Sequence, residues 1–469
     1  MQENYPEGRT IVCCFDGGGQ KFGDNTNVVK FFRALRKDLP SRQIVYYQPE
    51  AGTYRKYLPI PAVFSTLFCA LDSAVAINLN QRLKDGYKFI VQSHRKGDKI
   101  CLFGFSSGAH IARALASMIY KVGIIPPENL AQIDFAFSIS QMEGETGNVL
   151  CKEFRASFSK PAIVEFLGIW DTTSSVGTFI PRNHNNLSIN YAVNFVRHAL
   201  ALDERRSGYR PALWDEPYQD NELDNDVDEP PSWNREDRDG WVFEPQERYL
   251  ADVQEVWFTG CHDDIGGGSH TDKIKESLSY IPLRWMIKEC FAIATGIVFN
   301  NDYLVTLGLD PSVLEELAAG GPDIPEAEVD QAQHPLRDPD LDLDPEETIV
   351  TAKPPRDKTD SLAGIWDPLD LVRAWWILEY IPTLSVFQDD EFEFNGNWWF
   401  KRRQNRGRGR YIPFRKEDGY VLVHESVKDR IERTNENLNV LSIRTEDRYE
   451  PRALNWRVVV ESGAVLYVP

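Results

Sequence analysis

The chain has 469 residues, of which 42% are hydrophobic, and it contains 25 Phe, 18 Tyr and 12 Trp. This content is ample for a buried core and excludes a chain that is disordered throughout. The net charge of −19 at pH 7 argues against nucleic acid or an anionic membrane surface as the main partner, because both would repel the chain at long range. We therefore expect a soluble, globular protein that does not bind nucleic acid.

The chain has only seven cysteines, and two of them, Cys13 and Cys14, are adjacent in a strand-like run. This usage is not typical of a disulfide framework and favours a reducing compartment. No Cys/His spacing typical of structural zinc is present in the sequence, and the polar N-terminus lacks the apolar core of a signal peptide. We expect a cytoplasmic protein that needs no metal or organic cofactor, with export by a non-classical route left open.

The first predicted strand, residues 9–15, is a continuous apolar run that leads into Asp16, Gly17, Gly18 and Gly19. Consecutive glycines after a buried strand bring the backbone close to another group. A tight turn or a phosphate cradle would use the same glycines, but the GK[ST] of a P-loop does not follow. We interpret this stretch as an oxyanion-hole loop. Polar residues 25–27 then predict the start of a helix that runs to about residue 37.

An apolar segment at residues 57–79 follows the second predicted strand, residues 43–48. Pro59, Pro61 and Asp72 interrupt the segment, so we reject a transmembrane helix. A loop followed by a core helix is the simplest interpretation. A surface that faces the substrate or contacts a membrane transiently is the alternative.

The most informative stretch is residues 98–119, where an apolar strand ends in the sequence GFSSG, at residues 104–108, and passes at once into a helical pattern. A strand, a sharp turn and a helix are the setting of the nucleophile elbow G-x-S-x-G. The glycines on both sides of Ser106 remove side chains that would collide in so tight a turn. The helix N-terminus behind it offers N–H groups to an oxyanion. The motif in this setting predicts that Ser106 is a nucleophile.

Two later strands end in residues suited to complete a Ser-His-Asp triad. Residues 162–170 form an apolar strand that ends at Asp171, where the triad acid is expected, although a turn or capping role is the ordinary alternative. Residues 253–260 form another strand that leads to His262. Of the eight histidines, only His262 follows a buried strand and directly precedes a glycine run. We predict that it is the base, with His270 as its nearest rival.

Other segments are assigned by their composition. Asp264 is expected to anchor its loop through the N–H groups of the following glycines, and it is the reserve candidate for the triad acid. Residues 189–206 have a helical pattern, and the charged cluster at its end is more often a salt-bridge network than a catalytic group. Residues 391–410 juxtapose acidic and basic runs, which favours a self-paired hairpin over nucleic-acid binding.

Several motifs together resemble the α/β-hydrolase family of catalytic domains of bacterial type VI secretion phospholipase effectors and their uncharacterised fungal relatives. The motifs are FDGGG with NTNV (15–19, 25–28), GFSSGAHIARALA (104–116), FLGIWDTTSSVG (166–177), HALALDERR (198–206) and VWFTGCHDDIGGG (256–268). GRGRYIP (407–413) and VHESVKDR (423–430) resemble the fungal branch.

The resemblance implies that Ser106 is the nucleophile, Asp171 the acid and His262 the base, with phospholipids or other acyl lipids as substrates. The family usually has a bulkier basic residue at the position of Ser107 and a threonine at that of Gly18. Both positions belong to the predicted oxyanion hole, so the differences bear on substrate range and rate.

We therefore predict a serine hydrolase of carboxylic esters that works through an acyl-enzyme. The N–H groups of Ser107 and of the loop at Gly17 and Gly18 would hold the oxyanion, each contributing about 3 kcal/mol. Asp16 and Asp264 would support the site. Two alternatives remain open: a catalytically decayed hydrolase fold that only binds, and a phosphate-handling enzyme that uses Asp16, the glycine loop and a metal.

The predicted fold class is α/β-hydrolase-like, with a mostly parallel central sheet flanked by helices, acidic insertions and a C-terminal extension of mixed structure. The catalytic domain is expected over residues 1–300, with an acidic insertion or lid at about 207–250. A flexible loop rich in Pro, Asp and Glu is expected over 301–360. The remaining residues, 361–469, are expected to pack on the catalytic domain.

Overall fold

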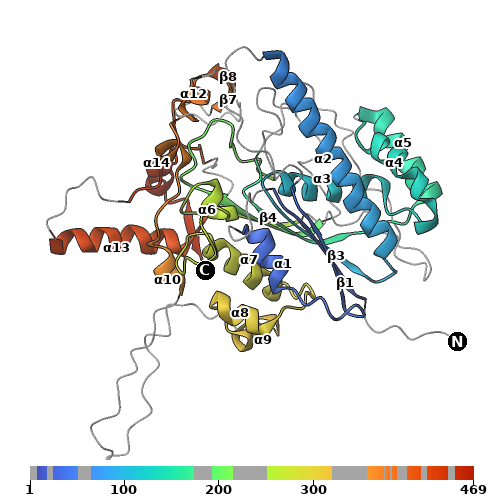
Figure 1. Cartoon of the computed structure of the whole chain (residues 1–469), viewed down its shortest axis with the longest axis horizontal. Coiled ribbons are helices and arrows are strands. Elements are labelled where there is room, and N and C mark those ends of the chain that lie inside the picture. The colour runs from blue at the N-terminus through green and yellow to red at the C-terminus, as the bar shows by residue number, and fades with distance from the viewer. Residues whose placement is uncertain are drawn as a thin grey trace, which may run out of the picture.

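The structure is a computed structural model. It describes residues 8–17, 25–50, 65–142, 144–173, 193–214, 251–319, 356–373, 375–380, 383–387, 399–412, 420–441 and 449–469. One central sheet dominates it, and helices lie on both faces of this sheet (Figure 1). The predicted class, an α/β-hydrolase-like fold with a mostly parallel sheet flanked by helices, is confirmed.

The central sheet has eight strands in the order β10-β9-β6-β5-β4-β3-β1-β2, and each neighbouring pair is parallel. Strands β1, β3 and β4 are mainly apolar because both faces of a parallel sheet are covered. All six residues of β1 are buried, for example. The strands are β1 (Thr10–Phe15), β2 (Gln43–Gln48), β3 (Lys99–Phe105), β4 (Val164–Trp170), β5 (Val193–Ala201), β6 (Asp252–Phe258), β9 (Val421–His424) and β10 (Val465–Val468).

The helices divide between the two faces of the sheet. One face is covered by α2 (Ser65–Ser93), α3 (Ser107–Val122), α4 (Ile133–Ser140) and α5 (Gly144–Phe158), with the short η1 (Pro127–Gln132) between α3 and α4. The other face is covered by α1 (Asn27–Ala34), α7 (Tyr280–Ala292), α8 (Asn301–Leu307) and α9 (Pro311–Ala318). The remaining helices are α6 (His262–Gly266), α10 (Arg356–Asp360), α11 (Pro368–Leu371), α12 (Trp375–Glu379), α13 (Glu425–Leu441) and α14 (Trp456–Glu461).

The C-terminal part of the chain completes the sheet. Strand β9 pairs with β6, and β10 pairs with β9. A third apolar cluster lies around these strands and buries Trp257 of β6 against Val423 and Trp456. Strands β9 and β10 thus belong to the sheet that carries the elbow. The division into a catalytic domain over 1–300 and a C-terminal extension over 361–469 remains a prediction.

Residues 189–206 were predicted as a helix, and this prediction is wrong where the structure describes the segment. Residues 193–201 form strand β5, which lies between β4 and β6. Its last six residues are all buried. The strand places polar residues such as Arg197 and His198 between apolar ones, so its sequence lacks the strict alternation that would distinguish a strand from a helix.

Where the structure describes the predicted loop over 301–360, the prediction is wrong, because these residues form helices α8, α9 and α10. Helices α8 and α9 bury Leu304, Leu307 and Leu314 against the sheet. Asn300 and Asp310 cap the two helices by accepting hydrogen bonds from backbone N–H groups. Of the predicted acidic segments, residues 215–250 and 320–355 lie outside the described residues.

The apolar segment at 57–79 enters α2, which begins at residue 65, and residues 57–64 lie outside the described part. Among the described residues, no helix has the length and apolar content needed to cross a membrane. The predicted hairpin also differs in its bounds: an antiparallel pair joins β7 (Thr383–Phe387) to β8 (Trp399–Arg403).

Candidate active site

Ser106 lies in a strained turn between β3 and α3. Its backbone has φ 53° and ψ −120°, a conformation that a residue other than glycine rarely adopts. The turn is tight enough that a Cβ on Gly104 would lie 2.5 Å from the carbonyl carbon of Gly108. Ser106 is itself partly exposed although most of its neighbours are buried. The predicted elbow geometry is therefore present, with the serine at its apex.

The glycine loop after β1 lies directly against this elbow. Strand β1 pairs with β3, and a Cβ on Gly17 would lie 2.0 Å from the Phe105 carbonyl oxygen and 2.7 Å from the Ser107 backbone nitrogen. A Cβ on Gly108 would lie 2.1 Å from the Phe15 carbonyl oxygen. Only glycines allow these two backbone segments to approach so closely. Gly18, the other predicted oxyanion-hole residue of this loop, lies outside the described residues.

Asp16 fixes the base of the glycine loop. Its buried carboxylate accepts hydrogen bonds from Thr26 Oγ1 at 3.0 Å and from the Tyr47 hydroxyl at 2.9 Å. Its carbonyl oxygen accepts one from Arg82 at 2.6 Å. Thr26 is also the N-cap of α1, so Asp16 ties the loop to the start of that helix. These contacts give Asp16 a supporting role. Its carboxylate already accepts hydrogen bonds from neighbouring side chains, which does not favour the phosphate-handling alternative.

Asp171 and His262 are brought together from the carboxyl ends of β4 and β6. His262 Nδ1 lies 2.6 Å from Asp171 Oδ2, and both residues are buried. The His262 ring packs between two aromatic rings: Phe105, with centroids 4.6 Å apart, and Tyr209, with centroids 4.8 Å apart. Because Phe105 directly precedes Ser106, the imidazole lies beside the elbow. The structure thus places the predicted acid and base next to each other, with the imidazole against the residue that precedes Ser106.

A further residue, Arg410, binds the same carboxylate. Its two terminal nitrogens lie 2.5 Å from Asp171 Oδ1 and 2.8 Å from Oδ2. Burial alone would raise the pKa of Asp171, but Arg410 and His262 hold that pKa well below its usual range. Sequence reasoning assigned the GRGR segment to a hairpin and missed this contact, because no local pattern connects residues 239 positions apart.

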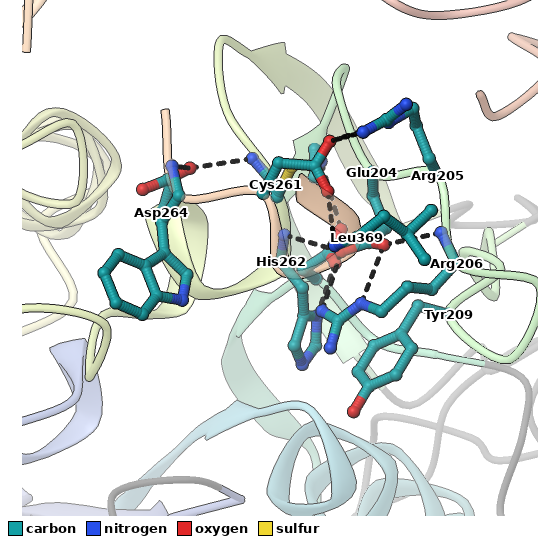
Figure 2. Close-up of polar contacts among 12 residues, drawn as sticks. Glu204, Arg205, Arg206, Tyr209, Cys261, His262, Asp264 and Leu369 are labelled. Carbon is teal, nitrogen blue, oxygen red and sulfur yellow. Dashed lines mark hydrogen bonds and ion pairs between the residues drawn. The ribbon is translucent and has the colours of Figure 1, made fainter. Parts of the chain in front are cut away.

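The charged cluster at residues 203–206 is a salt-bridge network, as predicted, and it supports His262. The His262 backbone N–H donates to Glu204 Oε2 at 3.2 Å, and Glu204 pairs with Arg206 at 2.8 Å. The Arg206 guanidinium lies 3.6 Å from the centre of the Tyr209 ring. Figure 2 shows Glu204, Arg206 and Tyr209 gathered around His262. The network holds the His262 backbone in place and fixes the Tyr209 ring that packs against its imidazole.

Asp264 anchors the His262 loop, but through different donors from those predicted. Its carboxyl group accepts from the backbone N–H group of Cys261 at 3.0 Å (Figure 2). It also accepts from the backbone N–H group of Trp366 at 2.9 Å. The glycine N–H groups are not the donors because α6 begins at His262, which places Asp264 in its first turn facing the N-cap residue. The rival base, His270, packs its ring edge-on against Trp366, with centroids 5.1 Å apart. Asp171, rather than Asp264, holds the imidazole nitrogen of His262.

Replacement of Asp264 with asparagine is expected to change how stability depends on pH. Burial raises the pKa of Asp264 to about 8, against about 3.9 in an unfolded chain. The folded state therefore keeps a proton that the unfolded state has released, and this contribution to stability is fully present below about pH 4 and is lost as the pH rises to about 8. Urea unfolding between pH 5 and 8 measures the difference.

The wild-type free energy of unfolding should decrease relative to that of Asp264→Asn by up to about 1.4 kcal/mol per pH unit over that interval. Asp134→Asn, on the exposed surface of α4, is the matched control. Parallel pH profiles for the wild type and Asp264→Asn would contradict the protonated state of Asp264.

The described residues contain no group of three or more His, Cys, Asp or Glu side chains that could hold a metal ion. The predicted catalytic residues are a serine, an aspartate and a histidine. Their order along the chain, serine then aspartate then histidine, is the order of an α/β-hydrolase.

Comparisons with known proteins place the chain in a family. An uncharacterised protein of Saccharomyces cerevisiae, YEL023C, is 26% identical, with 90% of this chain and 79% of that protein covered. Two solved structures, each 16% identical, also match. An uncharacterised protein of Pseudomonas aeruginosa has a TM-score of 0.31 and covers 67% of this chain and 50% of that one. A Tle1 effector bound to the VgrG spike of the type VI secretion system has a TM-score of 0.30 and covers 56% and 52%.

This chain therefore spans about half the length of those two solved structures. The family model for the catalytic domain of Tle1-like phospholipase effectors of the type VI secretion system matches residues 9–289. That range holds the glycine loop, the elbow, Asp171 and His262, and it covers more than half of the chain. The chain belongs to the family of Tle1-like type VI secretion phospholipase effectors, through their catalytic domain.

Proposed function

We propose that this protein hydrolyses carboxylic esters of acyl lipids, with phospholipids as the main class, through Ser106, His262 and Asp171. The observation that carries the proposal is the 2.6 Å hydrogen bond between His262 and Asp171 beside a serine held at positive φ. Membership of a phospholipase effector family supports a lipid substrate. The mechanism follows from the three side chains and the backbone around them.

The Asp171–His262 hydrogen bond sets the direction of proton transfer. An ionised Asp171 accepts the Nδ1–H of His262, which leaves the Nε2 lone pair to take the hydroxyl proton of Ser106. The Ser106 oxygen then attacks the acyl carbon. His262 returns the proton to the departing alcohol or lysophospholipid, and water repeats the sequence on the acyl-enzyme to release a fatty acid.

The negative charge on the attacked carbonyl oxygen needs N–H donors. Ser107 is the first residue of α3, where a backbone N–H has no partner within the helix and the helix dipole favours negative charge. The Gly17 backbone lies next to this N–H. We assign the oxyanion hole to the N–H groups of Ser107 and of the loop at Gly17 and Gly18, each donor contributing about 3 kcal/mol.

Apolar side chains next to the site suit a lipid substrate. Trp375 of α12 packs against Tyr209, with ring centroids 6.0 Å apart, and Tyr209 in turn contacts the His262 ring. On the same stretch of chain Leu371, Ile377 and Tyr380 are each more than half exposed. An exposed apolar surface near a site can receive acyl chains or contact a lipid aggregate. We assign that role to the surface of α11 and α12.

A lipid and ester panel tests the proposed function. Wild-type protein is incubated with phosphatidylcholine vesicles, phosphatidylglycerol vesicles, a diacylglycerol emulsion and p-nitrophenyl butyrate, and released fatty acid or nitrophenol is measured. Ser106→Ala is assayed in parallel. We expect release from at least one phospholipid by the wild type and none above background by the variant. A folded wild type that cleaves no ester, or equal release by both proteins, would overturn the proposal.

A further inference from the structure

The carboxylate of Asp171 is shared between an imidazole and a guanidinium. Asp171 Oδ2 lies 2.6 Å from His262 Nδ1 and 2.8 Å from an Arg410 nitrogen, while Oδ1 lies 2.5 Å from the other Arg410 nitrogen. The Ala201 backbone N–H also donates to Oδ1 at 3.0 Å. Each oxygen therefore accepts two hydrogen bonds, and the plane of the carboxylate is fixed from both sides.

Each nitrogen of the Arg410 guanidinium donates at least one hydrogen bond. Nε and one terminal nitrogen donate to the Tyr209 carbonyl oxygen, at 3.0 and 2.5 Å, and the other terminal nitrogen donates to the Ala201 carbonyl oxygen at 3.2 Å. The side chain is almost completely buried. Only a planar guanidinium can make these contacts at once, since an ammonium offers a single centre.

A cation in this position weakens the electrostatic attraction between the Asp171 carboxylate and a positively charged imidazole. An unneutralised carboxylate stabilises the protonated imidazole strongly, whereas a carboxylate that is paired with a guanidinium does so less, and the guanidinium repels a second positive charge. Other charged or titratable groups near His262 also contribute to the electrostatic potential at its imidazole. They are Glu50, Glu204, Arg206, Tyr209 and Asp263.

We propose that Arg410 is a positioning residue of the triad, which orients the Asp171 carboxylate toward His262 and balances part of its negative charge. The proposal rests on the proposed function. Arg410 lies beyond residues 9–289, the range that the family model matches. The C-terminal part of the chain thus supplies a group that the triad needs, in addition to strands β9 and β10.

Two substitutions in the full-length protein separate charge from geometry. Arg410→Met removes the charge and keeps much of the apolar stem, whereas Arg410→Lys keeps a charge but loses the paired hydrogen bonds. Arg408→Met, an exposed arginine two residues away, is the matched control. The pH dependence of kcat/KM is measured on p-nitrophenyl butyrate, with active sites counted by fluorophosphonate labelling so that unfolded protein does not enter the rates.

In Arg410→Met the acid limb of the kcat/KM profile should move to higher pH by about one unit. In Arg410→Lys that limb should stay within about 0.3 unit of the wild type, while kcat per active site falls at least about tenfold because the carboxylate is misplaced. Arg408→Met should match the wild type in both. A purely structural role predicts fewer active sites with unchanged profiles, and that result would overturn the proposal.

If Arg410→Met does not fold, Arg410→Lys tests the proposal alone. A kcat per active site of Arg410→Lys within twofold of the wild-type value would overturn the positioning role. A wild type that neither cleaves esters nor reacts with the fluorophosphonate would overturn the proposed function, and the role of Arg410 with it. An active wild type with an unmoved acid limb in folded Arg410→Met would overturn the role of Arg410 alone.

Discussion

Replacement of Ser106 with alanine is expected to lower ester hydrolysis by about 10⁶-fold, the scale on which a triad loses activity when its nucleophile is removed. The oxygen that attacks the acyl carbon is gone, while the backbone turn and the Asp171–His262 pair remain. Initial rates on p-nitrophenyl butyrate, together with far-ultraviolet circular dichroism, separate this loss from unfolding.

Ser138→Ala, an exposed serine on α4, is the matched control and should keep the wild-type rate. A Ser106→Ala protein that retains more than about one hundredth of the activity would exceed the residual rate that binding and oxyanion stabilisation alone can sustain. That result would require another nucleophile.

Replacement of Asp171 with asparagine is expected to lower kcat by about 10⁴-fold, because an amide can donate to Nδ1 and so hold the imidazole in the wrong tautomer. It also leaves the buried Arg410 guanidinium without its counter-charge. Breaking a buried ion pair by removing one partner typically costs about 3–5 kcal/mol, so a lower urea midpoint should accompany the slower reaction.

Asp134→Asn on the surface of α4 is again the control. Its kcat should match that of the wild type, and its free energy of unfolding should change by no more than about 0.5 kcal/mol. If Asp171→Asn keeps kcat within tenfold of the wild type, Asp171 is not the acid that orients His262. If kcat falls but the urea midpoint is unchanged, the ion pair with Arg410 is not formed in solution.

Much of the fold can be predicted from the sequence because its strongest signals are local. A buried parallel strand is a continuous apolar run, and the residue at its carboxyl end stands directly after that run. Ser106 and Asp171 each follow such a strand directly, whereas His262 comes a few residues after β6, of which only the last three residues are buried. Strands of one parallel sheet end at the same edge, so three separate patterns predict side chains that lie close together.

The errors have physical causes. Strand β5 was predicted as a helix because its polar residues, such as Arg197 and His198, are buried inside the fold and do not alternate with apolar ones. The helices α8 and α9 were included in an acidic loop, although their leucines face the core. An average over a long acidic segment does not reveal short amphipathic helices at its border.

Arg410 could not be predicted from a local pattern. Its partner is 239 residues away, and a short basic segment in an acidic protein is compatible with many surface contacts. The same reasoning applies to Trp366, whose backbone N–H binds Asp264 from 102 residues away. Tertiary contacts of this kind decide how the candidate site is supported, and only the folded arrangement identifies them.

Mass spectrometry of the wild type after reaction with a fluorophosphonate tests the central claim most directly. The intact folded protein should gain the mass of a single adduct, and peptide mapping should place it on Ser106. Protein that is unfolded in urea before the reaction should remain unmodified. An absence of adduct on folded protein, or an adduct on a different residue, would contradict the assignment of Ser106 as an activated nucleophile.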